Sequence, residues 1–328
     1  MAGPGALRRE GGLALSHPGA RRVPSPAADR LFRAGAGLCA LSVLLILVLL
    51  VATLAWKSLP AIRRFGPAFL WSDAWNPVTG TYGALSSIVG TLASTLIALA
   101  LAVPLSLTIA FFLVELAPPA VSRPVGLAIE LLAAVPSIIY GMWGLYVFAP
   151  LVSRHVQPAL ARAGGGSPFF GGPQMGIGVL TAGLILALMV LPFMTAVIRD
   201  VFSLVPHVVK EAAYGLGATT WEVARQVTLR YGLHGVIGAV VLGLGRAIGE
   251  TMAVTFVIGN EHRLSLSLFA PGNTIASTLA NEFSEASDPL HVSALVALGA
   301  ILLLLSAGVQ CAAQLWLSRV ERRSGAAR

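Results

Sequence analysis

The chain has 328 residues, of which 56 % are hydrophobic and only 11 % are charged. Soluble domains carry about 25 % charged residues, so this composition excludes an ordinary soluble protein and indicates an integral membrane protein. The net charge of +8 comes from cations in short loops and tails, an arrangement that fits membrane topology and anionic lipid rather than nucleic acid. The two cysteines, Cys39 and Cys311, both lie in apolar stretches and argue against a disulfide framework.

The N-terminal part of the chain changes from polar to apolar. Residues 1–33 are rich in Ala, Gly, Pro and Arg without apolar periodicity, which predicts a disordered, Arg-rich tail. The apolar stretch 34–55 is longer than the roughly 7–15 residues of a signal-peptide core, so we expect an uncleaved first transmembrane helix. In the following loop, 56–83, Trp71 and Trp75 are typical of residues at a membrane interface.

Five further apolar runs follow within a core at 84–318. They lie at about 84–114, 125–152, 175–198, 231–260 and 292–318. Each is long enough to cross a bilayer, which takes about 20 residues, and none shows the alternation of barrel strands. Pro104, Pro136 and Pro192 interrupt three of the runs, where proline often marks a kink or a break. We therefore predict an all-α integral membrane protein with six transmembrane helices.

The positive charges predict the orientation. If the tail 1–33 is cytoplasmic, the loop 203–230 and the C-terminal tail 319–328 lie on the same side, and these segments hold most of the Arg and Lys residues. The positive-inside rule therefore favours both termini in the cytoplasm.

The fifth apolar run, 231–260, carries Arg246 and Glu250 near its middle. An ionised side chain at a helix centre costs on the order of 2.5–3.5 kcal/mol on insertion scales. On one continuous helix, residues four apart share a face and partly compensate each other. One interpretation is a self-neutralising pair; the one we prefer is a polar site on a water-filled path. Three glycines nearby, Gly243, Gly245 and Gly249, would let a helix or a substrate approach.

The loop 203–230 predicts two short helices around a glycine turn. One apolar face follows the spacing i, i+3, i+4, i+7 and is formed by Val209, Ala212, Ala213 and Leu216. Thr219 and Glu222 have the spacing of a capping box for the second helix. Such an amphipathic segment docks on a soluble partner or lies on lipid, and composition leaves both open.

The order Glu211-Ala212-Ala213, with Gly217 four residues later, resembles the EAA loop of bacterial ABC importer permeases. In that family the loop forms a coupling helix that fits a groove on a cytoplasmic ATPase subunit. This sequence departs from the motif at its end, where Arg230 stands in place of a proline.

Three further stretches, 245–254, 135–141 and 267–275, are similar to the phosphate-specific transport permeases of the PstC type. The resemblance implies a type I ABC importer permease fold in a multi-pass protein of the bacterial inner membrane. It also implies a homologous second permease of the PstA type, an ATPase subunit dimer, an extracytoplasmic phosphate-binding protein and membrane lipid as partners.

We expect no catalytic or metal-binding residue and no cofactor in this chain. Its two lysines, Lys57 and Lys210, do not end a Gly-x4-Gly-Lys pattern, so it has no phosphate-cradling nucleotide loop. ATP and Mg would bind to the partner ATPase.

Phosphate in an apolar medium needs a cation and several hydrogen-bond donors. Arg246 offers both and stays charged, while Glu250 would neutralise it when the path is empty. Ser137 and Thr251 could add hydroxyl donors or instead bond to their own helix carbonyls. We therefore expect cargo to pass near Arg246 by alternating access, with energy entering at the EAA loop. Two alternatives stay open: a permease for another oxyanion, such as sulfate or molybdate, and a scaffold that signals phosphate status.

Overall fold

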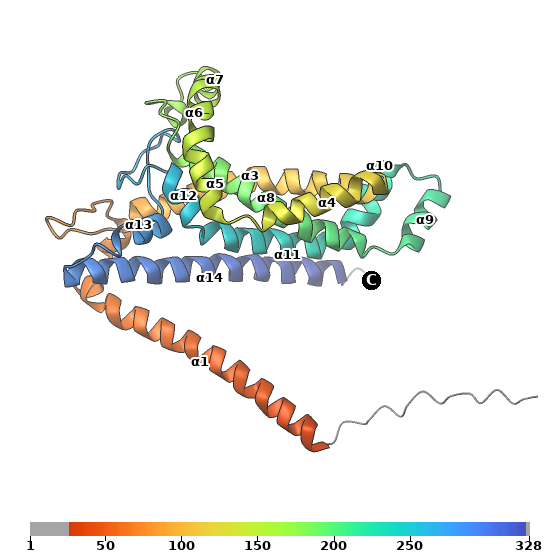
Figure 1. Ribbon diagram of the computed structural model, residues 1–328, viewed down its shortest axis with the longest axis horizontal. Helices are drawn as coiled ribbons and strands as arrows, with labels where there is room; N and C mark the ends of the chain where they lie inside the picture. Colours follow the sequence, from red (N-terminus) through yellow and green to blue (C-terminus); the bar gives the residue numbers. More distant parts are fainter. Residues whose placement is uncertain (1–25, 326–328) are drawn as a thin grey trace, which may run out of the picture. The chain divides into compact units, whose positions relative to one another are not determined.

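The computed structural model describes residues 26–325, which are almost entirely helical and contain no named strand. Two isolated bridges, Asn76–Thr81 and Gly259–Gly272, are the strand-like pairings in this range. The helices are shown in Figure 1 and are α1 (Pro26–Phe65), α2 (Ala68–Trp71), α3 (Leu85–Phe111), η1 (Phe112–Leu116), α4 (Pro119–Ala133), α5 (Ser137–Trp143), η2 (Gly144–Phe148), α6 (Ala149–Leu151), η3 (Val152–Val156), α7 (Gln157–Ala163), η4 (Pro168–Phe170), α8 (Val179–Ser203), α9 (His207–Gly215), α10 (Thr220–Glu222), η5 (Val223–Thr228), α11 (Leu229–Ile248), α12 (Met252–Val257), α13 (Ile275–Glu282) and α14 (Pro289–Gly325).

The chain forms two compact units, residues 1–52 and 53–328. In the described part of the first unit, α1 begins at Pro26, so the predicted disordered tail 1–33 is wrong for its last eight residues. Residues 1–25 of that tail lie outside the described range. Apolar side chains occupy every side of the helix from residue 41 to 51, the pattern of a segment surrounded by lipid.

Five helices are long and apolar enough to cross a membrane, and a bent pair would make a sixth. The five are Asp29–Phe65, Leu85–Leu116, Val179–Ser203, Thr220–Ile248 and Pro289–Trp316, and the pair Pro119–Ala133 and Ser137–Ala163 is bent by 90°. The third predicted span is therefore not one straight helix. It breaks at Pro136, because proline has no N–H to donate to the preceding turn.

The fifth predicted span is also discontinuous. Helix α11 ends at Ile248, and α12 starts only at Met252. Gly249 caps the end of α11, where its N–H bonds to the carbonyl of Gly245 at 3.4 Å. The prediction of one helix over 231–260 is wrong at this point; glycine has a low helix propensity because it loses the most backbone entropy on folding, and Gly249 follows Gly243 and Gly245.

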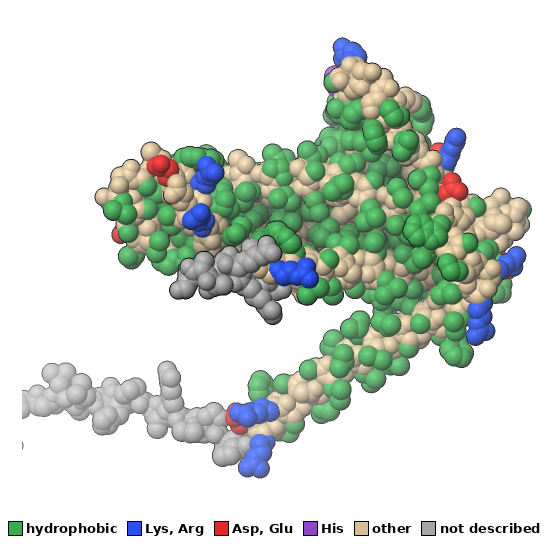
Figure 2. Space-filling view, turned by 180° about the vertical axis from the view of Figure 1, so that it is seen from behind, with side chains coloured by type: hydrophobic (Ala, Val, Ile, Leu, Met, Phe, Trp, Pro, Cys, Tyr) green, Lys and Arg blue, Asp and Glu red, His purple; other side chains and the backbone are tan. Residues whose placement is uncertain are grey.

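The core of the second unit lies between α3 and α8. The facing positions on α3 are small, as at Ala98 and Ala102, and they pack against Ile185, Leu186 and Met189 on α8. Small residues allow helices in a membrane to approach closely. The face seen in Figure 2 is largely hydrophobic over the bundle, and its charged side chains lie mainly near the ends and at the tip of the α6–α7 projection.

The two ends of this unit differ. Helices α9 and α10 lie at one end of the bundle, and α13 lies at the other (Figure 1). At the α9 end, the Phe111 and Phe202 rings pack in a tilted arrangement with centroids 4.6 Å apart. At the α13 end, Tyr82 and Phe69 pack with Ile275 and Leu298 in a second cluster. These clusters hold in place the helices that carry the polar sites described below.

Candidate functional site

Arg246 lies in the last turn of α11, two residues before the helix ends. Its side chain is exposed, and its guanidinium carbon lies 5.5 Å from the centroid of the Phe193 ring on α8. Tyr140, near the start of α5, is close enough to interact electrostatically with it. Among the contacts of residues 26–325, Arg246 has no hydrogen bond and no ion pair. A permanent cation therefore stands at a helix break with an aromatic face as its protein neighbour.

Glu250 does not pair with Arg246 in the described structure. Because α11 stops at Ile248, the two residues do not share a helix face, and the expected mutual compensation is a wrong prediction here. The Glu250 carboxylate instead accepts a hydrogen bond at 3.1 Å from the N–H of Ala253. It thereby satisfies one of the free N–H groups at the start of α12.

The two predicted hydroxyl donors have different surroundings. Thr251 donates to the carbonyl of Gly249 at 3.3 Å, which is the local backbone bond considered as an alternative. Ser137 is half-buried at the first position of α5. Four residues later on the same side of that helix, a Cβ added to Gly141 would lie 3.0 Å from the Cα of Ala253. The helices that follow the two breaks, α5 after Pro136 and α12 after Thr251, therefore pack closely against each other.

The glycines near Arg246 serve mainly helix packing. A Cβ added to Gly243 would lie 2.7 Å from the sulfur of Met194 on α8, and one added to Gly245 would lie 2.6 Å from Gln310 on α14. Gly249 has open space around it apart from its own helix. Sequence reasoning missed Phe193 and Tyr140 as neighbours of Arg246, and no spacing in the sequence points to either.

The loop 203–230 contains the predicted glycine turn and a short first helix, α9, but the predicted second short helix is the start of the long run Thr220–Ile248. Glu211 and Ala212 are exposed on α9, Ala213 is half-buried, and Gly217 has a φ of +87°, which requires glycine. The capping box is present, since the N–H of Thr219 bonds to Glu222 at 2.8 Å and the N–H of Glu222 bonds to the Thr219 hydroxyl at 3.3 Å. From Thr220 to Ile248 the helical run is unbroken and passes through Arg230.

Large apolar side chains project from this loop. Leu216 is 90 % exposed, Val208 75 % and Trp221 70 %. Exposed apolar residues on a short helix mark an interaction surface. Of the predicted apolar face, Val209, Ala212 and Leu216 are exposed and Ala213 is half-buried, so the bundle leaves most of it uncovered.

Lys210 is the exception on α9, because it points inward and is buried. Its Nζ lies 2.7 Å from Oε1 of Glu115 on η1. The hydroxyl of Thr228 on η5 donates to the same carboxylate oxygen at 2.6 Å.

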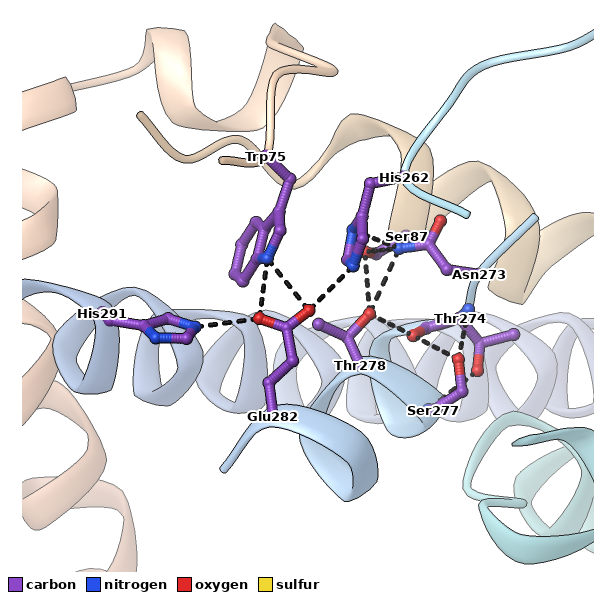
Figure 3. A network of polar contacts seen from close by, with 9 residues as sticks. All are labelled: Trp75, Ser87, His262, Asn273, Thr274, Ser277, Thr278, Glu282 and His291. Atoms are coloured by element: carbon purple, nitrogen blue, oxygen red, sulfur yellow. Dashed lines mark hydrogen bonds and ion pairs between the residues drawn. The ribbon is translucent and has the colours of Figure 1, made fainter. Parts of the chain in front are cut away.

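A polar network at the α13 end centres on the carboxylate of Glu282 (Figure 3). Its oxygens accept hydrogen bonds from the Trp75 indole at 2.8 Å, from His262 at 2.9 Å and from His291 at 2.8 Å. The side-chain nitrogen of Asn273 lies 2.9 Å from Nδ1 of His262, so both ring nitrogens of His262 have a polar partner. Burial raises the pKa of Glu282, but the hydrogen bonds from His262, Trp75 and His291 outweigh it and hold the pKa below its ordinary value.

This network corrects one prediction about the loop 56–83. Trp71 is 75 % exposed, as expected of an interfacial residue. Trp75 is instead half-buried, stacks on His262 with ring centroids 5.1 Å apart, and donates to Glu282. No spacing in the sequence signals this network, because two of its bonded members, Trp75 and Glu282, are 207 positions apart.

A family model described as "Binding-protein-dependent transport system inner membrane component" matches residues 77–322. The chain belongs to this family. The match covers α3 to nearly the end of α14 and therefore both helix breaks, the loop 203–230 and Glu282 with its partners His262 and His291.

Relatives within this transport family are similar over nearly their whole length. The "Phosphate transport system permease protein PstC" of Pasteurella multocida (strain Pm70) is 52 % identical over 301 residues, which cover 90 % of this chain and 94 % of that protein. The proteins of the same name from Mesorhizobium japonicum and Xylella fastidiosa (strain 9a5c) are 50 % and 47 % identical. They cover 91 % and 94 % of this chain, and 92 % and 97 % of their own lengths.

Solved transporter structures share the fold. A chain of the MetNI methionine ABC transporter superposes with a TM-score of 0.57 at 17 % identity, covering 75 % of this chain and 99 % of that chain. A chain of a bacterial ABC transporter that imports the polysaccharide alginate gives a TM-score of 0.56 at 14 % identity, covering 89 % and 99 %. The predicted family and the type I ABC importer permease fold are confirmed, and the chain is a multi-pass membrane protein. The roles of individual residues stay predictions.

Proposed function

We propose that this chain is the transmembrane permease subunit of an ATP-driven importer of inorganic phosphate. The names of the relatives support phosphate as the cargo. The observation that carries the proposal is the Arg246 side chain, which is exposed at a helix break without a carboxylate partner in the described structure. A permanent guanidinium charge in an apolar bundle needs an anion or water as its counterpart.

The groups around Arg246 suit transient rather than tight binding of an anion. Arg246 supplies charge and several N–H donors, and Ser137 supplies a hydroxyl from the neighbouring break. Glu250 and Thr251 hold the backbone between α11 and α12 through their own local bonds. The negative charge of Glu250 near the path disfavours long residence of a second anion, as a translocation site requires.

Energy enters at the loop 203–230, which we place in the cytoplasm together with both termini. The surface offered to an ATPase subunit dimer is formed by the exposed Glu211, Ala212, Leu216 and Gly217 and by the half-buried Ala213. ATP and Mg belong to that partner, and this chain supplies no catalytic group. A homologous second permease of the PstA type and an extracytoplasmic phosphate-binding protein complete the importer, which resides in the bacterial inner membrane.

The test uses the complete transporter reconstituted in liposomes with ATP inside and the binding protein outside. We expect Arg246→Leu to reduce phosphate uptake at least about tenfold, which corresponds to about 1.4 kcal/mol of lost stabilisation, while assembly is retained. Arg154→Leu is the matched control, because Arg154 is also exposed and has no hydrogen-bond or ion-pair partner in the described structure, but lies on η3, away from the break.

Unchanged uptake by Arg246→Leu would remove this residue from the path. Competition separates the possible cargoes: phosphate uptake should persist in excess sulfate or molybdate. Uptake of sulfate or molybdate in place of phosphate would keep the permease role and overturn the proposed cargo.

A further inference from the structure

Helix α9 is tied to the bundle by a buried ion pair. The side chains of Lys210 and Glu115 are only 9 % and 6 % exposed, and their charged atoms lie 2.7 Å apart. The neighbours of Lys210 on α9, Val209 and Glu211, are exposed. One cation therefore turns inward from a helix whose other side chains face outward.

Glu115 collects bonds from three separate segments. It lies on η1, which continues α3, and its Oε1 accepts bonds from Lys210 on α9 and from Thr228 on η5 at the start of the α11 run. Both η1 and η5 are π-helical, a rare and wide turn that recurs at functional sites. The carboxylate thus joins α9 to two of the membrane helices at one point.

Stability alone does not account for a buried ion pair at this place. The cost of removing both charges from water offsets much of their attraction, and an apolar pair of similar volume often stabilises as well. A charge pair adds one defined geometry, because it keeps its strength only while both groups remain aligned. The chain itself connects α9 to α8 and to α10, whereas α3 is reached through space by Lys210.

We propose that the Lys210–Glu115 ion pair transmits movement of α9 to the second membrane helix, α3. Thr228 keeps the carboxylate aligned between α9 and the α11 run. Lys210, Glu115 and Thr228 are positioning residues. They touch neither nucleotide nor cargo, and they couple ATP hydrolysis to transport. The inference rests on the proposed function, in which α9 receives the force of the ATPase.

The decisive variant replaces both charges at once. Glu115→Leu with Lys210→Met leaves no unpaired buried charge, so the complex should assemble with its ATPase as the wild type does. In liposomes containing the complete transporter, we expect ATP hydrolysis to continue while anion uptake per ATP falls about tenfold. The exchanged pair, Glu115→Lys with Lys210→Glu, should recover at least half of the lost uptake per ATP.

Asp29→Asn is the matched control, because it removes the Arg33–Asp29 pair, which is exposed and 3.4 Å long. It should leave uptake per ATP unchanged. The inference is overturned if the apolar double variant keeps the wild-type ratio, if the exchanged pair recovers nothing, or if the double variant fails to assemble, since the pair then serves assembly. The ratio is measured with phosphate or with whichever oxyanion the wild type transports, so a wrong cargo contradicts the proposed function alone.

Discussion

Glu282 and Arg246 are two charged residues of this protein whose side chains have opposite surroundings. The Glu282 carboxylate has three side chains donating to it. Arg246 has the Phe193 and Tyr140 side chains as neighbours but no hydrogen bond or ion pair in the described structure, although Glu282 and Arg246 belong to the same helical unit. A charge that holds a structure together must be saturated with partners, because an unpaired buried charge is costly. A charge that serves a passing anion must keep its donors available.

The charged residues also differ in which segments of the chain they hold together. Glu282 joins the loop 56–83, the loop before α13 and the start of α14 through Trp75, His262 and His291. Glu250 is intermediate, with one bond to the start of α12. We therefore expect stability to depend strongly on Glu282, weakly on Glu250 and very little on Arg246, with transport following a different order.

The largest expected effect on stability is that of Glu282→Ala. It leaves the donors of Trp75, His262 and His291 without their acceptor, so the free energy of unfolding should fall by on the order of 3 kcal/mol. Thermal unfolding of the purified chain in detergent measures this. Glu285→Ala, at an exposed position three residues on, should change stability by less than about 0.5 kcal/mol. Equal effects of the two variants would contradict the role of the network.

The same network predicts a pH dependence. The folded-state pKa of Glu282 lies below its ordinary value of 4.5, so the stabilisation is fully present above about pH 4.5 and is lost as the pH falls through the lower folded-state pKa. The difference in unfolding temperature between wild type and Glu282→Gln should therefore be constant at higher pH and shrink in acid. A difference that grows as the pH falls would show the opposite sign.

A smaller effect is expected from Glu250→Ala. It removes the acceptor for the Ala253 N–H at the start of α12, and losing such a cap costs about 1 kcal/mol. Glu250→Gln keeps an acceptor oxygen and should cost less. Unfolding temperatures of the two variants, compared with wild type, test this order. If the amide variant is the less stable one, the charge and not the cap holds this break.

The smallest stability change should come from Arg246→Leu, the variant expected to reduce uptake most strongly. The contact with Phe193 is worth about 0.5–1 kcal/mol, and removing an unpaired charge from an apolar bundle offsets it. The unfolding temperature should thus remain close to that of wild type. A large loss of stability would show that Arg246 is a structural residue, and the contrast with Glu282 would fail.

Much of the framework could be predicted from the sequence. The apolar runs predict the membrane helices, Thr219 and Glu222 predict a capping box that is present, and the Glu211–Gly217 pattern predicts the exposed α9. These features depend on neighbours within a few positions along the chain. Contacts between residues far apart in the sequence could not be predicted in this way. The bond between Trp75 and Glu282, for example, joins residues that are 207 positions apart.

The sequence by itself determined the class of protein, the number of apolar runs and the position of the amphipathic loop 203–230, because hydropathy and local capping are properties of short segments. Only the tertiary structure decided that α11 ends before Glu250, that Arg246 is left without a carboxylate partner and that Lys210 turns inward to Glu115. Each of these depends on which helices approach one another. The free energy of a charge in an apolar bundle is set by those neighbours and not by its position in the chain.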